Sequence, residues 1–201
     1  MVLSDKKIRE LATSAGLLEP FDEERLQAVS YDISSGNVAM VYQPLAEAVD
    51  LRNKNQVELV TRKVDITNGY HIKPGEYILV KTREKFSMPA NMTAHIRPRT
   101  TFTKFGLIVS DQHMNPTFKG YLYLGLYNAT PNIIDIYPNL NIAQMVFEEI
   151  TGEISKDKLY DHKKDAKYQN EDSFIQPHIE EEMPEIKRKE VEAFVNELVG
   201  R

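Results

Sequence analysis

The chain has no cysteine among its 201 residues. Disulfide bonds are therefore excluded, and so are zinc sites that need thiolate ligands. The sequence also has no run of 18 apolar residues, the length that a membrane-spanning helix needs. Residues 1–7 contain no apolar core of the length found in signal peptides. These absences predict a cytoplasmic protein that does not enter a membrane.

The sequence also has no excess of basic over acidic residues. Lysine and arginine total 25 against 30 acidic residues, which gives a formal net charge of −5. Nucleic acids and anionic membranes bind proteins through basic surfaces, so this balance argues against both as partners. A local cluster of basic side chains can still hold a small polyanion such as a nucleoside triphosphate.

The first segment has the pattern of a helix. Ser4 is suited to the N-cap position, and Ile8 and Ala12 recur at helical spacing. Gly16 then ends the pattern. We therefore predict a helix over residues 4–14.

The pattern changes from about residue 31 to residue 150. Short runs rich in β-branched and aromatic residues, such as 76–80, 93–96 and 121–124, alternate with glycine, proline and asparagine. Several short strands at this spacing predict a mainly β fold, either a β-barrel or a jelly roll.

The last part of the chain is different again. Residues 153–182 are polar and irregular, and residues 184–199 begin with Pro184 and carry one apolar stripe at helical spacing. The stripe consists of Val191, Phe194, Val195 and Leu198. We predict a β-barrel with its N-terminal helix at 1–152, followed by a C-terminal arm and helix at 153–201.

Four stretches, in order, resemble the dCTP deaminase branch of the dUTPase and dCTP deaminase superfamily. They are residues 3–8, 99–107, 114–120 and 141–147, the last followed by 165–169. The resemblance implies a dUTPase-like barrel or jelly roll that forms a homotrimer. It also implies nucleotide sites between subunits, each holding dCTP or dUTP with Mg²⁺ bound through the nucleotide phosphates, and no protein-bound metal.

The resemblance assigns nucleotide-binding roles to two groups of residues. Hydroxyl and cationic side chains are suitable donors for phosphate oxygens. In the family, the first loop contacts the phosphates and the catalytic water, which makes Thr100 a catalytic candidate as well. The assigned residues are Arg99, Thr100, Thr101 and Lys104 in this loop, with Gln144, Tyr160 and Lys167 further along. Glu171 departs from the pattern, because the family has a glutamine there that binds the base or sugar.

Two further departures affect the chemistry that the resemblance implies. Gly125 stands where the deaminases carry a glutamate that activates water, and its structural explanation is close packing against a neighbouring backbone. Asn115 stands where dUTPases carry an aspartate base. An amide can position a water molecule but cannot accept its proton at neutral pH. Loss of a general base typically costs ~10²–10⁴-fold in rate.

Asp111 and His113 form a new acid–base pair in a segment that is shorter than in the deaminases. They are either solvated turn residues or a relocated base. Three functions therefore stay open: dCTP deamination to dUTP, a dUTPase-type diphosphatase, and a catalytically silent nucleotide-binding or regulatory trimer. A purely structural interaction module is a fourth possibility.

Overall fold

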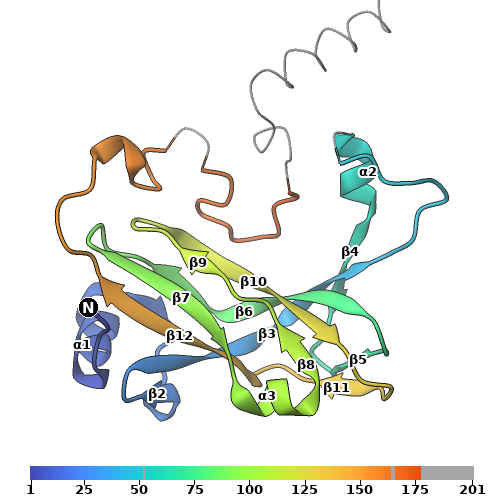
Figure 1. Cartoon of the computed structure of the whole chain (residues 1–201), viewed down its shortest axis with the longest axis horizontal. Coiled ribbons are helices and arrows are strands. Elements are labelled where there is room, and N and C mark those ends of the chain that lie inside the picture. Colours follow the sequence, from blue (N-terminus) through green and yellow to red (C-terminus); the bar gives the residue numbers. More distant parts are fainter. Residues whose placement is uncertain (52, 164–165, 178–201) are drawn as a thin grey trace, which may run out of the picture.

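A computed structural model describes residues 1–51, 53–163 and 166–177 (Figure 1). The predicted closing helix at 184–199 lies outside the described residues. The described helices are α1 Asp5–Ala15, α2 Lys54–Leu59 and α3 Thr100–Phe105, with 3-10 turns η1 Glu23–Arg25 and η2 Lys156–Lys158. The strands are β1 Leu18–Glu19, β2 Leu26–Gln27, β3 Ser30–Tyr42, β4 Thr61–Asp65, β5 Tyr70–Ile72, β6 Tyr77–Ser87, β7 Met92–Pro98, β8 Leu107–Val109, β9 His113–Met114, β10 Lys119–Asn128, β11 Ile134–Ile136 and β12 Asn141–Glu149.

The N-terminal helix agrees with the prediction to within one residue at each end. It begins after Ser4, whose side chain makes no capping hydrogen bond, and it ends at Gly16 in the left-handed conformation with φ of 63°. Ile8 and Ala12 are buried, so the apolar stripe faces the protein core. The predicted helix is confirmed, but Ser4 contributes its backbone carbonyl, which accepts from the Ile8 amide at 3.0 Å, and not its hydroxyl.

One curled antiparallel sheet forms the body of the protein, in the order β8-β10-β6-β3-β12-β7-β9 (Figure 1). The long strand β3 belongs to both sides of the curl, because its first half pairs with β12 and its second half with β4 and β6. Its register shifts between Ser35 and Ala39. At this bend lies Gly36, where a Cβ would come within 3.0 Å of the Lys81 carbonyl oxygen. The predicted mainly β fold is confirmed.

The core lies inside the curl. Its largest fully buried side chains include Tyr31, Ile33, Ile78, Phe86, Ile96 and Phe147. These side chains come from β3, β6, β7 and β12, and the edge strands add Leu107 and Val109 of β8 and Met114 of β9 to the same core. Across the described ranges, no helix is long and apolar enough to cross a membrane.

The C-terminal arm, residues 153–163 and 166–177, returns from β12 and crosses the sheet above β9 and β10 (Figure 1). Its backbone pairs with β10, because the Tyr121 amide donates to the Glu171 carbonyl at 3.0 Å. Asp172 continues the contact through an ion pair of 2.6 Å with Lys85 on β6. The polar residues of this segment therefore fix the arm to the barrel.

Candidate functional site

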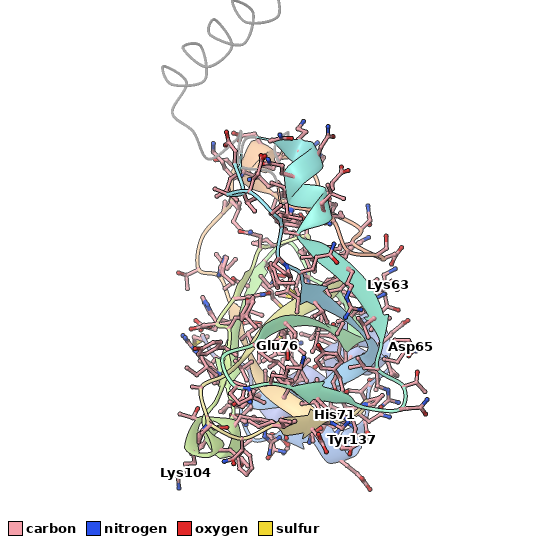
Figure 2. All side chains as sticks on the ribbon, turned by 90° about the vertical axis from the view of Figure 1, so that its right-hand side faces the viewer. Lys63, Asp65, His71, Glu76, Lys104 and Tyr137 are labelled. Atoms are coloured by element: carbon pink, nitrogen blue, oxygen red, sulfur yellow. The ribbon has the colours of Figure 1, made fainter. Side chains whose placement is uncertain are left out.

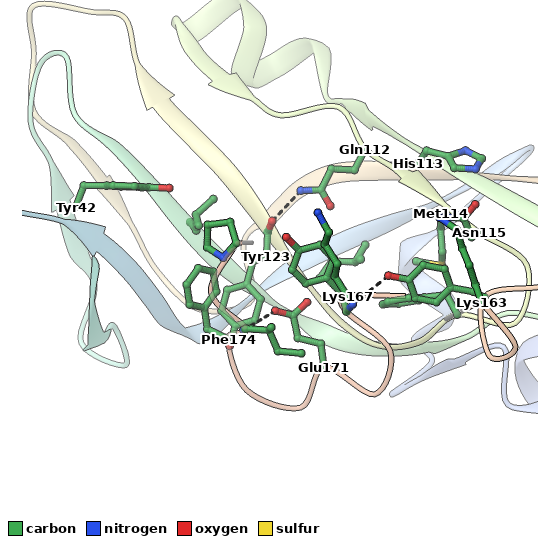
Figure 3. A pocket seen from close by; sticks show the side chains of 17 residues that line it. Tyr42, Gln112, His113, Met114, Asn115, Tyr123, Lys163, Lys167, Glu171 and Phe174 are labelled. Atoms are coloured by element: carbon green, nitrogen blue, oxygen red, sulfur yellow. Dashed lines mark hydrogen bonds between the residues drawn. The ribbon is translucent and has the colours of Figure 1, made fainter. Parts of the chain in front are cut away.

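A cavity of about 650 Å³ lies between the arm and the sheet (Figure 3). Its volume is within the range of small-molecule sites, roughly 300–1,000 Å³. β9, β10 and the turn between them form one wall, and the arm forms the other. The polar residues of the lining include Gln112, His113, Asn115, Tyr123, Tyr160, Lys163, Lys167, Tyr168 and Glu171. We call this cavity the arm pocket.

The turn between β9 and β10 holds the arm by several hydrogen bonds. The Tyr160 amide donates to the Pro116 carbonyl at 3.1 Å, and the Asp161 amide donates to the Thr117 hydroxyl at 3.0 Å. The Tyr160 ring packs on Phe118 with 5.8 Å between centroids. The arm thus presents Tyr160 and Lys167 to the same cavity as His113 and Asn115, which brings four of the predicted site residues together.

Asp111 and His113 lie two residues apart, but only one of them lines the arm pocket. His113 is exposed on β9, lines the arm pocket, and packs against His95 with 5.0 Å between ring centroids and the rings tilted by 48°. Asp111 is exposed, makes an ion pair of 2.5 Å with Arg97, and is not part of the pocket lining. Of the two residues that the sequence offers as a relocated base, only His113 reaches this cavity.

Glu171 is the residue of the arm pocket whose role sequence reasoning missed. Its side chain is buried, with the residue 7% exposed, and one carboxylate oxygen accepts from the Ile175 amide at 2.9 Å. Burial raises the pKa of this carboxyl to about 7, against smaller lowering effects of the Ile175 amide and Lys81. The one signal in the sequence was the departure from the family's glutamine at this position, which does not show that the carboxylate is buried.

The loop before and along α3 forms a second group of predicted site residues, and a buried carboxylate organises it. Asp32 makes an ion pair with Arg99 and accepts from the Gln144 amide nitrogen at 3.3 Å. Asp32 is almost fully buried, so the guanidinium charge of Arg99 is balanced inside the protomer. Arg99, the N-cap residue of α3, is thus tied to Asp32 on β3, and Gln144 on β12 bonds the same carboxylate.

The rest of this loop lies far from the arm pocket. Figure 1 places α3 at the end of the barrel opposite to the arm, and Figure 2 shows Lys104 at the same end. Thr100, Thr101 and Lys104 are exposed. Arg99 and Thr101 line a separate hollow of about 470 Å³. Within one protomer, the predicted phosphate-binding residues are thus divided between two places.

Gly125 is buried on β10, and its missing side chain has been replaced by a neighbour. A Cβ built at this position would overlap the hydroxyl of Tyr77 and lie 2.5 Å from its Cζ. The Tyr77 residue is 39% exposed, and its ring packs on Tyr42 with 5.7 Å between centroids. Close packing at Gly125 is therefore confirmed, but the expected neighbouring backbone was wrong, because a side chain from β6 fills the space.

Comparisons with known proteins identify the family of the chain. The profile of the family described as "dCTP deaminase-like" matches residues 2–150. A protein of Persephonella marina named "dCTP deaminase, dUMP-forming" is 34% identical over 152 residues, covering 75% of this chain and 84% of that protein. The "dCTP deaminase" of Helicobacter hepaticus is 31% identical over 190 residues, covering 88% of this chain and 97% of that protein.

A solved structure shares the fold. The 2'-deoxycytidine 5'-triphosphate deaminase of Agrobacterium tumefaciens superposes with a TM-score of 0.60 at 21% identity. The match covers 73% of this chain and 48% of that one, so this chain spans about half the length of that structure. The family match and the identities to its relatives show that the chain belongs to the dCTP deaminase-like family. The resemblance found in the sequence is confirmed.

We predict that Gly125→Glu destabilises the fold, because the new side chain must displace the Tyr77 ring from its contact with Tyr42. Overpacking of this kind costs roughly 1–3 kcal/mol. The same substitution in a Tyr77→Ala background should cost clearly less. Urea unfolding of the two single variants and the double variant measures the coupling. Equal costs of Gly125→Glu in both backgrounds would show that Tyr77 does not control this space.

Proposed function

We propose that this chain binds dCTP in the arm pocket and hydrolyses the amino group of its cytosine, releasing ammonia and dUTP. The observation that carries the proposal is the arm pocket itself, a nucleotide-sized cavity in a member of the dCTP deaminase-like family. It gathers Asn115 and His113 from the sheet side with Tyr160 and Lys167 from the arm.

The lining of the arm pocket suits the parts of a nucleotide. Tyr123, Phe118 and Phe174 offer aromatic surface for the faces of a pyrimidine ring. Lys163 and Lys167 bring positive charge to the arm side, where a polyanionic chain would bind. The amides of Gln112 and Asn115 can both donate and accept hydrogen bonds, as the polar edges of a base require.

Magnesium would be bound through the phosphates of the nucleotide. No group of three His, Asp or Glu side chains that could hold a metal ion occurs in the residues placed by the structure. Mg²⁺ commonly keeps several waters and binds substrate phosphates, so a protein cage is not required. When bound, the ion would neutralise phosphate charge alongside Lys167.

We further infer that the site is completed by a neighbouring copy in a homotrimer. Thr100, Thr101 and Lys104 carry the donors that a triphosphate needs, yet they lie at the opposite end of their own protomer from the arm pocket. A second copy that places its α3 against the arm pocket would bring both groups together. Thr100 would then lie beside the attacking water, and Lys104 beside the phosphates.

A dUTPase-type diphosphatase is the second candidate, because several relatives are named for forming dUMP. In this chain Asn115 lines the arm pocket at the position that the diphosphatase chemistry would use, and it can orient a water molecule. The third candidate is a silent nucleotide-binding trimer, which Gly125 and Asn115 favour. The products formed from dCTP and dUTP distinguish the three.

We therefore expect the purified full chain, incubated with dCTP and Mg²⁺, to release ammonia in proportion to the dCTP consumed. Ammonia, diphosphate and bound nucleotide are to be quantified separately, with dUTP as a parallel substrate. Release of diphosphate from either nucleotide would show that the chain also has diphosphatase activity. Bound nucleotide without any product would establish the silent trimer, and absence of binding to dCTP and dUTP would reject the proposed site.

The shared site predicts complementation between two variants. Lys104→Ala and Lys167→Ala should each weaken dCTP binding by roughly 1.5–3 kcal/mol, the contribution of a hydrogen bond to a charged group. Trimers that contain both variant chains should recover a fraction of wild-type sites, because some sites combine an intact Lys104 with an intact Lys167. Lys63→Ala, an exposed lysine on β4, is the control for loss of charge (Figure 2). A monomer in sedimentation at micromolar concentration would reject the shared site.

A further inference from the structure

The arm pocket contains a single carboxylate among the described residues that line it, and that carboxylate is Glu171. Deamination of a pyrimidine needs a group that removes a proton from water and returns it to the leaving amine. Asn115 cannot accept a proton, and Asp111 lies outside the pocket in its ion pair with Arg97. Glu171 and the exposed His113 at the rim are the remaining candidates.

The position of Glu171 is fixed from three sides. Its carbonyl accepts from the Tyr121 amide at 3.0 Å, and its carboxylate accepts from the Ile175 amide at 2.9 Å. Its side chain lies beside Tyr123 of β10 in the wall of the cavity (Figure 3). A carboxylate has about four lone-pair sites, so one amide donor leaves most of its acceptor capacity available to a ligand. By contrast, His113 is exposed to solvent, and its ring packs at a tilt against His95.

Glu171 lies on the same side of β10 as position 125, where glycine provides no side chain. Tyr123 and Gly125 alternate to the same face of the strand, roughly 7 Å apart at about 3.4 Å per residue. Leu79, the partner of Gly125 in the sheet, lines the arm pocket as well. The arm therefore brings a carboxylate to the Tyr123 part of this face, two residues before Gly125.

We propose that Glu171 is the general acid–base of deamination in the arm pocket; this rests on the proposed function. The Glu171 carboxylate takes one proton from water as the water oxygen bonds to C4 of cytosine, and it delivers that proton to N3. It then takes the second proton, from the new hydroxyl, and passes it to the amino nitrogen as the C4–N bond breaks. The products are the uracil ring and ammonia, and Glu171 returns to its starting state.

The ionisation of Glu171 is compatible with this role. A proton shuttle works best when its pKa is near the working pH, and burial raises the pKa of Glu171 to about 7. Lys81 opposes this shift from β6. The other titratable or charged groups of the pocket lining are Tyr42 on β3, Tyr123 on β10, His113 on β9, and Tyr160, Lys163, Lys167 and Tyr168 on the arm, with Asp172 next in the chain to Glu171.

Glu171→Gln is the direct test in the full chain. The amide oxygen can keep the Ile175 hydrogen bond. The pKa of Glu171 is raised in the folded state, so the fold favours the neutral carboxyl. Its contribution to the free energy of unfolding is therefore full below the ordinary glutamate range and is lost as the pH rises through about 7. The neutral glutamine should therefore fold well at pH 7.5. We expect dCTP affinity within about threefold of wild type, and ammonia release lowered by roughly 10²–10⁴-fold.

Two further measurements separate chemistry from structure. The kcat/KM of the wild type should rise with pH through about 7, the pKa of Glu171, and the residual activity of Glu171→Gln should lack this ionisation. In Glu171→Ala, added formate should restore part of the ammonia release, because a free carboxylate can occupy the vacated space. Asp161→Asn, an exposed carboxylate on the arm outside the pocket lining, is the matched control and should keep wild-type rates.

The outcomes are distinct. Wild-type turnover that survives in Glu171→Gln within tenfold overturns the role of Glu171 and leaves the proposed function intact. A wild type that binds dCTP without releasing ammonia also overturns that role, but it keeps the nucleotide site. Failure of the wild type to bind dCTP rejects the proposed function, and the role of Glu171 with it.

Discussion

The close approach of two backbones, at Gly120 on β10 and Glu171 on the arm, determines the rest of the site. Gly120 has φ of 143°, and a Cβ there would lie 2.8 Å from the Glu171 amide nitrogen. A larger residue would therefore lift the arm from the sheet. The neighbouring hydrogen bond from the Tyr121 amide to the Glu171 carbonyl fixes the distance between the arm and the sheet. This distance is possible because position 120 has no side chain.

The same contact decides the electrostatics of the pocket. This contact brings the backbone of Glu171 onto β10 and removes its carboxylate from water. The resulting burial raises the pKa of Glu171 to about 7. The contact also raises the pKa of the adjacent Tyr123 to about 12, through desolvation first and the Glu171 charge second. A single structural feature thus both encloses a nucleotide-sized cavity and prepares a carboxylate for proton transfer near neutral pH.

Much of the fold was accessible from sequence because its signals are local. The helix ended by Gly16 and the strands punctuated by glycine and proline were predicted, and the ordered motifs gave the family. The pairing of Arg99 with Asp32 and the filling of Gly125 by Tyr77 were not predicted. Both join residues that are distant in sequence, so they depend on strand register and sheet curvature, which no short motif encodes. The predicted division of the chain at residue 152 stays a prediction.

Hydrogen exchange of the full chain, with and without dCTP and Mg²⁺, tests most directly whether the arm pocket is the nucleotide site. A ligand bound between arm and sheet should slow amide exchange at residues 113–122 and at 166–176 together, since both walls would be fixed at once. Protection that leaves both of these segments unchanged, even if it appears around α3, would contradict a site beneath the arm.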